Sequence, residues 1–492
     1  MTAPATQPRV SEASAESSPA LGARQLVASQ VVRRVFRVAI LLVAARLLGV
    51  TGFGVYALLL TLVEMVAVVS GFGYADYLTR EVAKRPGAAW PLFTRVTQVR
   101  LLYIVPSVLA ALLVLKVLGF SPAMGRSLTL FSLTLLPRAF NESAQGVLKG
   151  LRRFGLLPWI EFVQGATGLV GAPLLLMRGL GLNGMLAAEV AAAGAGCVVA
   201  VAGAARVVDF HRTEDLPLTA VLRATFAFNV YPVLANVYDR VDVVLLAKLA
   251  GSIATGIYSL PYRAYATLSI LPSGVMGSLL PVFSASRADQ EARQKCAQAM
   301  KFLYATALLA VLGTWAFARP AILLVLGESY LASATVLRIL VWASIPMFLN
   351  GALNTLLLAA HKEKVFLGTA SACLVFNVAA NLIVIPRFSY HGAAGVTVAT
   401  EVLLLAQNLY WVRRFFGELV LPAGVIGITA AFAATLGSLF VLQRVLPETW
   451  AEATAFGGFA VVLAATWKGA AFHAFKVAMR PRMMEPQTRF RE

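Results

Sequence analysis

The chain has 492 residues, of which 59% are hydrophobic and 13% are charged. Because average soluble proteins carry about 25% charged residues, this composition excludes an ordinary soluble protein and indicates a chain that lies mostly in lipid. The formal net charge of +19 does not indicate nucleic acid as a partner, because the basic residues cluster in alternate connections between apolar segments.

Apolar runs of about 20 residues, the length that crosses a hydrocarbon core as a helix, follow one another along nearly the whole chain. They lack the alternation of a barrel strand and therefore predict an all-α polytopic membrane protein. We count 14 such runs and expect two parallel six-helix lobes followed by two C-terminal helices. The predicted spans are residues 31–48, 54–74, 96–118, 128–147, 156–177, 183–205, 224–246, 257–282, 300–317, 335–358, 365–385, 392–411, 420–442 and 453–472.

The longest polar connection inside this array separates the sixth span from the seventh and marks the expected midpoint. The predicted organisation is a disordered cytoplasmic tail (1–24), an N-lobe (25–205), a cytoplasmic linker (206–223), a C-lobe (224–414), two further spans (415–475) and a basic cytoplasmic tail (476–492). The three cysteines and four histidines lack metal-ligand spacing, and no hydrolytic or phosphoryl-transfer motif is present. We therefore expect no metal, no cofactor and no enzymatic activity.

Basic residues form groups in every second connection, such as Arg33, Arg34 and Arg37 at the start of the first span. The intervening connections carry mostly single charges, such as Arg46 and Arg178. This alternation follows the positive-inside rule and predicts that both termini lie in the cytoplasm.

One segment of the sequence occurs twice. ARLLGVTGFGVYAL begins at Ala45, and AKLAGSIATGIYSL begins at Ala247, 202 residues later. Six predicted spans separate the two copies, so both point the same way across the membrane and predict parallel repeats. Similar offsets relate GLNGMLAAEV to GAAGVTVATE, and NESAQ at 141–145 to NGALN at 350–354.

Polar residues inside the predicted spans are the candidates for a transport site, because a charge at the bilayer centre costs about 2.5 to 3.5 kcal/mol. Helical spacing places those of the fourth span on one stripe, and those of the seventh span lie close together. The substrate-binding candidates are Arg138, Asn141, Gln145, Asn236, Arg240 and Arg263. The ion-coupling candidates are Asp239, Asp242, Glu142 and Glu161.

A structural role remains open for each of these groups. Arg138 and Glu142 are spaced to form an ion pair that only holds the bundle together. The cluster of the seventh span can equally be a set of charges that snorkel at the membrane surface. Each of the other intramembrane acids is either a proton or cation site or a partner for a basic residue; these are Glu64, Glu189 and Glu401.

Four stretches of the chain carry a resemblance to a known family: ARLLGVTGFGVYAL, GFGYADYLTREVAK, VYDRVDVVLLAKLAGSIATGIYSLPYRAY and GAAG at 392–395. They resemble the bacterial polysaccharide flippases, the O-antigen and exopolysaccharide translocases of the multidrug, oligosaccharidyl-lipid and polysaccharide exporter superfamily, and the resemblance covers roughly residues 24–414. It implies two six-helix lobes that alternate between inward-open and outward-open states. It also implies a polyprenyl-pyrophosphate-linked oligosaccharide as the cargo, carried to the outer leaflet through a cationic cavity.

On this resemblance, Arg138, Arg240 and Arg263 are expected to face the cavity, and Asp239 and Asp242 to couple an ion. The expected partners are the lipid-linked oligosaccharide, membrane lipids, and polymerase and chain-length proteins of the same pathway, in a bacterial inner membrane. A cation-coupled multidrug antiporter and a lipid II flippase of the same superfamily remain as alternatives. A polymerase or ligase usually has a long outer loop, which the predicted spans leave no room for, and a scaffold subunit would leave the intramembrane charges unexplained.

Overall fold

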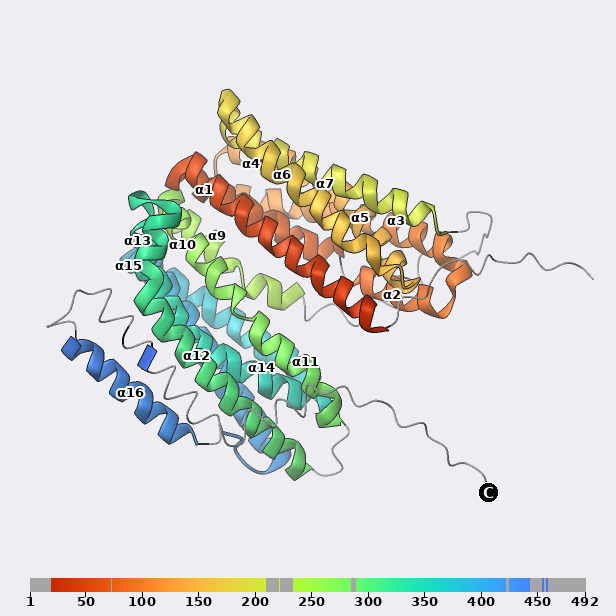
Figure 1. Cartoon of the computed structure of the whole chain (residues 1–492). Coiled ribbons are helices and arrows are strands. Elements are labelled where there is room, and N and C mark those ends of the chain that lie inside the picture. The colour runs from red at the N-terminus through yellow and green to blue at the C-terminus, as the bar shows by residue number, and fades with distance from the viewer. Residues whose placement is uncertain are drawn as a thin grey trace, which may run out of the picture. The chain divides into compact units, whose positions relative to one another are not determined.

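The computed structural model describes residues 19–71, 73–208, 221, 233–284, 289–421, 424–442, 454 and 457–458. Within these residues every regular element is a helix and no strand is formed (Figure 1), which confirms the predicted all-α class. Six helical stretches among them are long and apolar enough to cross a membrane. They are Leu21–Lys84, Pro86–Val117, Phe154–Ala205, Gln290–Leu326, Ala332–Ala359 and Lys364–Phe416.

The chain packs as two compact units. The first comprises Met1–Leu47 and Leu62–Asn229, and the second comprises Leu48–Thr61 and Val230–Glu492. The long helix α1 (Pro19–Gly71) therefore begins in the first unit, contributes Leu48–Thr61 to the second, and ends in the first. Its helical geometry is interrupted at Gly49, which has φ 66° and ψ 178°.

In the part that the structure describes, the first unit is built from α1 and six further helices, joined by short 3-10 and π turns. These helices are α2 (Tyr74–Lys84), α3 (Ala89–Val117), α4 (Pro122–Ser132), α5 (Leu135–Gly150), α6 (Leu157–Leu175) and α7 (Gly181–Ala205). Helix α7 packs against α5 and α6, and its many Gly and Ala residues allow the backbones to approach closely. The core of the unit includes the fully buried Leu78, Leu92 and Val147.

Among its described residues, the second unit contains eight labelled helices besides the segment of α1. They are α9 (Val241–Leu249), α10 (Gly251–Thr267), α11 (Ile270–Ser284), α12 (Asp289–Leu326), α13 (Ala332–Leu340), α14 (Ser344–Ala359), α15 (Lys364–Phe416) and α16 (Val425–Leu442). Helix α14 packs against α11, α12 and α15. The core of the unit includes the buried side chains of Met300, Phe348 and Leu353.

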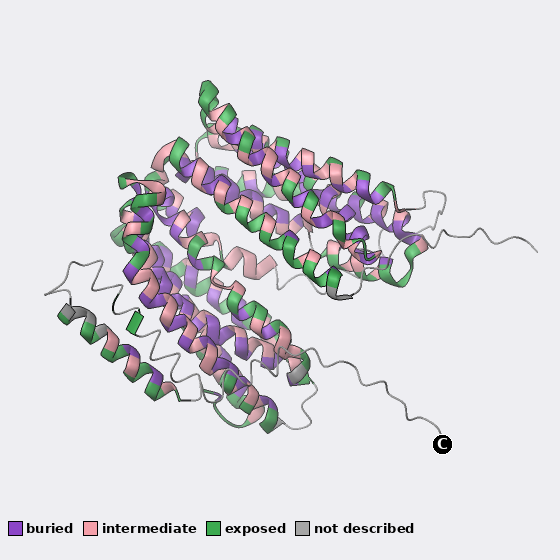
Figure 2. Cartoon of the chain, in the orientation of Figure 1, coloured by how far each residue is buried: buried purple, intermediate pink, exposed green. Residues whose placement is uncertain are grey.

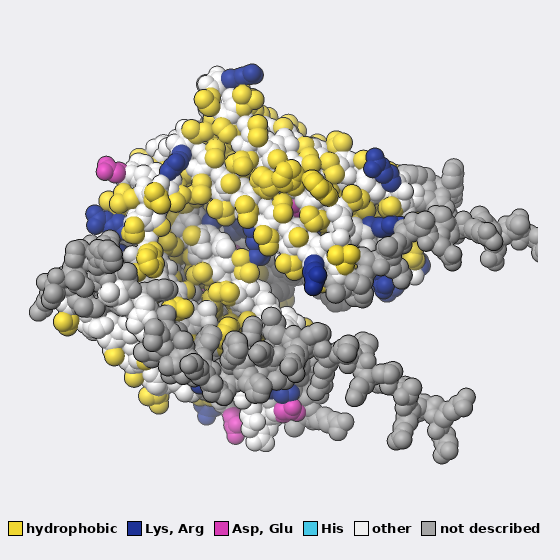
Figure 3. Space-filling model, viewed as in Figure 1, with side chains coloured by type: hydrophobic (Ala, Val, Ile, Leu, Met, Phe, Trp, Pro, Cys, Tyr) yellow, Lys and Arg dark blue, Asp and Glu magenta, His cyan; other side chains and the backbone are white. Residues whose placement is uncertain are grey.

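Exposed apolar side chains follow the outer faces of the helices. Figure 2 shows buried residues on the inner sides of the helices in each unit and exposed residues on their outer sides. Hydrophobic side chains cover much of the surface seen over α6 and α7 in Figure 3. On α3 the exposed residues recur at helical spacing, as Leu102, Val105, Leu109 and Leu113, and such a stripe is suited to contact with lipid tails.

Several predicted spans are longer or more broken in the structure than hydropathy indicates. The predicted spans 31–48 and 54–74 lie almost wholly in α1, and 365–385 and 392–411 lie in α15, with an interruption at Ser389, which has φ 49°. The predicted span 257–282 is divided into α10 and α11. The break lies at Leu268 and Ser269, because Pro272 in the first turn of α11 has no N–H to bond backwards.

Other expectations fall outside the described residues. These are most of the linker 206–223, the first part of the seventh span, nearly all of the span 453–472, and most of both tails. The count of 14 spans and the arrangement of two six-helix lobes remain predictions.

Candidate functional site

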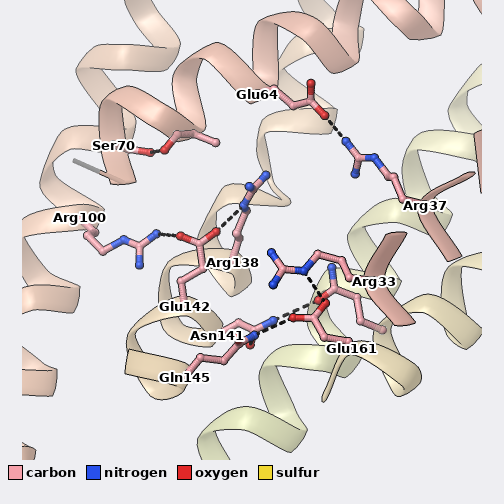
Figure 4. A network of polar contacts seen from close by, with 12 residues as sticks. Arg33, Arg37, Glu64, Ser70, Arg100, Arg138, Asn141, Glu142, Gln145 and Glu161 are labelled. Carbon is pink, nitrogen blue, oxygen red and sulfur yellow. Dashed lines mark hydrogen bonds and ion pairs between the residues drawn. The ribbon is translucent and has the colours of Figure 1, made fainter. Parts of the chain in front are cut away.

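A carboxylate bound by two arginines lies in the first unit (Figure 4). Nε of Arg138 donates a hydrogen bond to Oε1 of Glu142 on the same helix, α5, over 2.7 Å. Arg100 of α3 donates to the other oxygen of Glu142. Arg100 is only 4% exposed, whereas Arg138 is 44% exposed. Two guanidinium groups thus share one carboxylate, which leaves this cluster with a net positive charge.

The remaining polar residues of α5 contact α6. Asn141 donates to Oε1 of Gln164 over 3.1 Å, and Gln145 donates to Oδ1 of Asn141 over 3.1 Å and to Oε1 of Glu161 over 3.2 Å. Asn141 and Gln145 of the predicted stripe are therefore part of a largely buried chain of hydrogen bonds. Nε of Arg33 on α1 lies 3.3 Å from Oε2 of Glu161 and ends this chain with a charge.

Arginines on α1 join the same network and were not singled out from the sequence. Arg33 binds Glu161 and Arg37 binds Glu64, although both arginines were counted from the sequence only among the basic residues at the start of the first span. They are 57% and 38% exposed. Because α1 begins at Pro19, both lie within a helix, and their spacing of four residues on one face was the signal that could have identified them. Arg100, inside the predicted third span, was also missed.

Gly196 of α7 makes room for this network. A Cβ atom at this position would lie 2.7 Å from Oε1 of Gln164 and 3.3 Å from Nδ2 of Asn141. Gly194, two residues earlier on the same helix, has nothing within 4 Å of its Cβ position. The glycine at 196 is therefore required by packing, whereas the one at 194 is not.

Replacing Gly196 by Ala should consequently lower the thermal stability of the purified protein. We expect a loss of about 1 to 3 kcal/mol, as is typical for overpacking of a filled site. Thermal unfolding in detergent measures the loss, with Gly194→Ala as the matched control. Equal melting temperatures for the two variants would contradict the packing role assigned to Gly196.

The second unit contains a cavity of about 420 Å³ with an acidic lining. Three carboxylates border it, those of Asp239, Asp242 and Glu401, together with the aromatic rings of Tyr238, Tyr262 and Tyr265. No Lys, Arg or His is among its lining residues within the described part of the chain. The lining is therefore suited to a cation or a proton rather than to an anion.

Two of these carboxylates, those of Asp242 and Glu401, accept hydrogen bonds. Asp242 accepts from the hydroxyl of Tyr258 over 2.5 Å and from the backbone N–H of Val243 over 2.7 Å. The Tyr258 hydroxyl also lies 3.0 Å from Oγ1 of Thr397. Glu401 accepts its hydrogen bonds from a different set of donors.

Glu401 of α15 accepts hydrogen bonds from the hydroxyl of Tyr238 over 3.2 Å and from Nδ2 of Asn350 over 3.1 Å. Asn350 in turn accepts from Nδ2 of Asn408 over 3.0 Å. These partners are neutral, so the negative charges of Asp242 and Glu401 are oriented but not neutralised by the hydrogen bonds described.

The sequence-predicted site residues are divided between the two units. Arg138, Asn141, Glu142, Gln145 and Glu161 belong to the network of the first unit. In the second unit, Asp239 and Asp242 line the cavity, Asn236 and Arg240 precede α9, and Arg263 lies half-buried on α10. From the sequence, Glu401 was noted only as an intramembrane acid. It borders the same cavity as Asp239 because two segments far apart in the sequence pack together, which the sequence alone does not reveal.

The sequence matches the family described as polysaccharide biosynthesis protein over residues 43–335. The chain is 21% identical over 386 residues to the probable low-salt glycan biosynthesis flippase Agl15 of Haloferax volcanii, which covers 75% of this chain and 78% of that protein. It is 26% identical over 305 residues to the succinoglycan biosynthesis transport protein ExoT of Rhizobium meliloti, which covers 61% of this chain and 60% of that protein.

Two solved structures share the fold. The lipid II flippase MurJ in an inward closed conformation aligns with a TM-score of 0.69 at 12% identity, over 91% of this chain and 99% of that one. An inward-facing multidrug resistance transporter of the MATE family aligns with a TM-score of 0.65 at 14% identity, over 80% and 98% of the two chains. This likeness identifies the fold of a multi-pass membrane transporter. The family match extends over more than half of the sequence, and the chain belongs to the polysaccharide biosynthesis protein family.

Proposed function

We propose that the chain is a flippase that moves a polyprenyl-pyrophosphate-linked oligosaccharide from the cytoplasmic to the outer leaflet of a bacterial inner membrane, and that it is a transporter rather than an enzyme. The observation that carries this proposal is the arginine network of the first unit. Arg33, Arg37 and Arg138 are each more than a third exposed there while paired with glutamates. The family match and the names of the two relatives support the same reading.

The physical reason for such a network is the cost of moving a pyrophosphate through lipid. Charged and polar groups are strongly disfavoured in hydrocarbon, so a carrier must supply compensating charge and hydrogen-bond donors. The planar guanidinium group can donate two parallel hydrogen bonds to phosphate oxygens. Glu142 would hold Arg138 in place while that arginine binds the pyrophosphate, and Arg240 and Arg263 would add positive charge from the second unit.

The acidic cavity of the second unit is proposed as the coupling site. Asp239 and Asp242 would bind a cation or a proton, and Glu401 would share this role because it borders the same cavity. In the first unit, Glu142 and Glu161 are paired with arginines and would act in positioning. A potential that is negative inside would also favour outward movement of the anionic cargo, by about 2.3 kcal/mol per charge per 100 mV.

Deletion of the gene in its own organism tests the proposed cargo. We expect loss of the surface polysaccharide and accumulation of its lipid-linked oligosaccharide on the cytoplasmic leaflet. The purified protein in proteoliposomes should expose that lipid to a lectin added on the trans side. Unchanged exposure of the lipid in proteoliposomes, together with normal surface polysaccharide after deletion, would contradict the proposal.

A cation-coupled multidrug antiporter is the second candidate, favoured by the acidic cavity and its three tyrosines. Acidic, aromatic pockets are suited to organic cations. Expression of the chain in a drug-sensitive strain would then raise resistance to a lipophilic cation such as ethidium. We expect no such resistance, because the exposed charges of the first-unit network are arginines.

A further inference from the structure

The two copies of the duplicated segment meet each other in the second unit. A Cβ atom on Gly54 of α1 would overlap the carbonyl oxygen of Ser252 and would lie 2.9 Å from the backbone nitrogen of Gly256. In the reverse direction, a Cβ atom on Gly256 of α10 would overlap the carbonyl oxygen of Val50 and would lie 3.2 Å from its Cγ1 atom. Each glycine therefore lies directly against the backbone of the other copy.

The contact is reciprocal in sequence as well as in space. Gly54 and Gly256 occupy the same position in the two copies, and so do Val50 and Ser252, because the offset is 202 residues in each case. Each half of the contact thus pairs the residues equivalent to those of the other half, as the predicted internal repeat leads one to expect. A chance meeting of two glycine-rich helices would not pair equivalent residues in both directions.

The residues around the contact repeat in the same way. Gly49 and Gly251, five positions before the two contact glycines, both have positive φ, 66° and 83°. Tyr56 and Tyr258, two positions after them, are both fully buried. Each copy therefore consists of a left-handed glycine, a short helix start that carries the contact glycine, and a buried tyrosine.

The contact also connects the two units through the chain. Leu48–Thr61 packs within the second unit, whereas the stretches of α1 before and after it belong to the first. The ring of Phe53 in this segment lies 6.4 Å from the ring of Tyr330. If the rest of α1 moves, this segment therefore either stays packed on α10 while the helix bends on both sides of it, or moves with the rest of α1 and separates from α10.

We propose that the crossing of Gly54 and Gly256 is the gate that closes the outer end of the transport path, an inference that rests on the proposed flippase function. The crossing follows the first predicted span, so with cytoplasmic termini it lies at the outer side. At its centre backbone lies against backbone, so no interlocking side chains hold the two glycines together there. Only glycine allows the helices to approach this closely. The outward-open state requires the two faces to separate.

The first test measures opening of the gate. In a protein whose Cys197, Cys296 and Cys373 are replaced by Ser, Ser252→Cys serves as the reporter, because Ser252 is half-buried beside the contact. Gly54→Ala should increase its labelling by a membrane-impermeant maleimide on intact cells several-fold, because the added Cβ prevents closure. Gly274→Ala is the matched control, since nothing lies within 4 Å of its Cβ position. Equal labelling rates in the two variants would overturn the gate.

The second test keeps both glycines and so does not depend on the folding of Gly54→Ala. Val50→Cys and Ser252→Cys, both half-buried, are joined with a short reducible bifunctional thiol reagent. Export should stop on cross-linking and return on reduction, whereas each single cysteine should export normally with or without reagent. Normal export by the cross-linked protein would show that the crossing does not open during transport, and would overturn the gate. The labelling test needs no cargo. A changed labelling rate would therefore support the gate even if glycan export were not the function.

Discussion

Glycan export should fall by about thirtyfold when Arg138 is replaced by Ala. This estimate corresponds to about 2 kcal/mol, the value of a hydrogen bond between charged groups. Arg138 is the arginine of the Glu142 cluster whose side chain is substantially exposed. Surface polysaccharide, measured per amount of membrane-inserted protein, gives the readout. Export by Arg138→Lys should lie between that of the unaltered protein and that of Arg138→Ala, because lysine keeps the charge but lacks the planar guanidinium group.

Two further variants separate binding from a structural role. Arg100 binds the same carboxylate but is nearly fully buried, so Arg100→Ala should lower the melting temperature of the purified protein more than Arg138→Ala does. Arg126 is exposed on α4, and Arg126→Ala should leave export unchanged. Unaltered export by Arg138→Ala at normal protein levels would show that the Arg138–Glu142 pair only holds the bundle together.

The helical class of the protein could be predicted from the sequence because apolar runs and lipid solvation depend on local composition. The positions at which helices end or are interrupted were predicted less accurately. Hydropathy treats 257–282 as one span because Leu268, Ser269 and Pro272 do not interrupt its apolar character, yet the backbone there forms two helices. Arg33 and Arg37 were counted only as basic residues at the start of the first span, because hydropathy treats a charge as the boundary of a span. In the structure Glu161 and Glu64 neutralise these charges.

The candidate site shows the same limit. Helical spacing placed Asn141 and Gln145 on one face, and the structure confirms that they contact each other. Their contacts with Gln164 and Glu161 bring two helices together, and nothing in a single sequence reports which helices are neighbours. The duplicated glycines were visible as a repeat, but their mutual contact depends on how the two copies pack.

Asp242→Asn is expected to abolish the dependence of export on the coupling ion. Asn has nearly the same size as Asp and can still accept the hydrogen bond from Tyr258, but it carries no charge and takes up no proton. One coupled charge contributes about 2.3 kcal/mol per 100 mV, which corresponds to about fiftyfold in transport driven by the gradient. Transport of the lipid-linked oligosaccharide in vesicles with an imposed proton or sodium gradient measures this loss and identifies the ion.

Glu401→Gln should reduce the same gradient-driven transport, because Glu401 borders the same cavity and its hydrogen bonds from Asn350 and Tyr238 leave its charge in place. Glu363→Gln, at an exposed position before α15, removes a carboxylate elsewhere in the second unit and should have no effect. Tyr258→Phe should weaken coupling less than Asp242→Asn, since it removes one donor but no charge. If Asp242→Asn and Glu401→Gln both keep the full response to either gradient, the cavity is not the coupling site. The potential acting on the anionic cargo would then have to drive export alone.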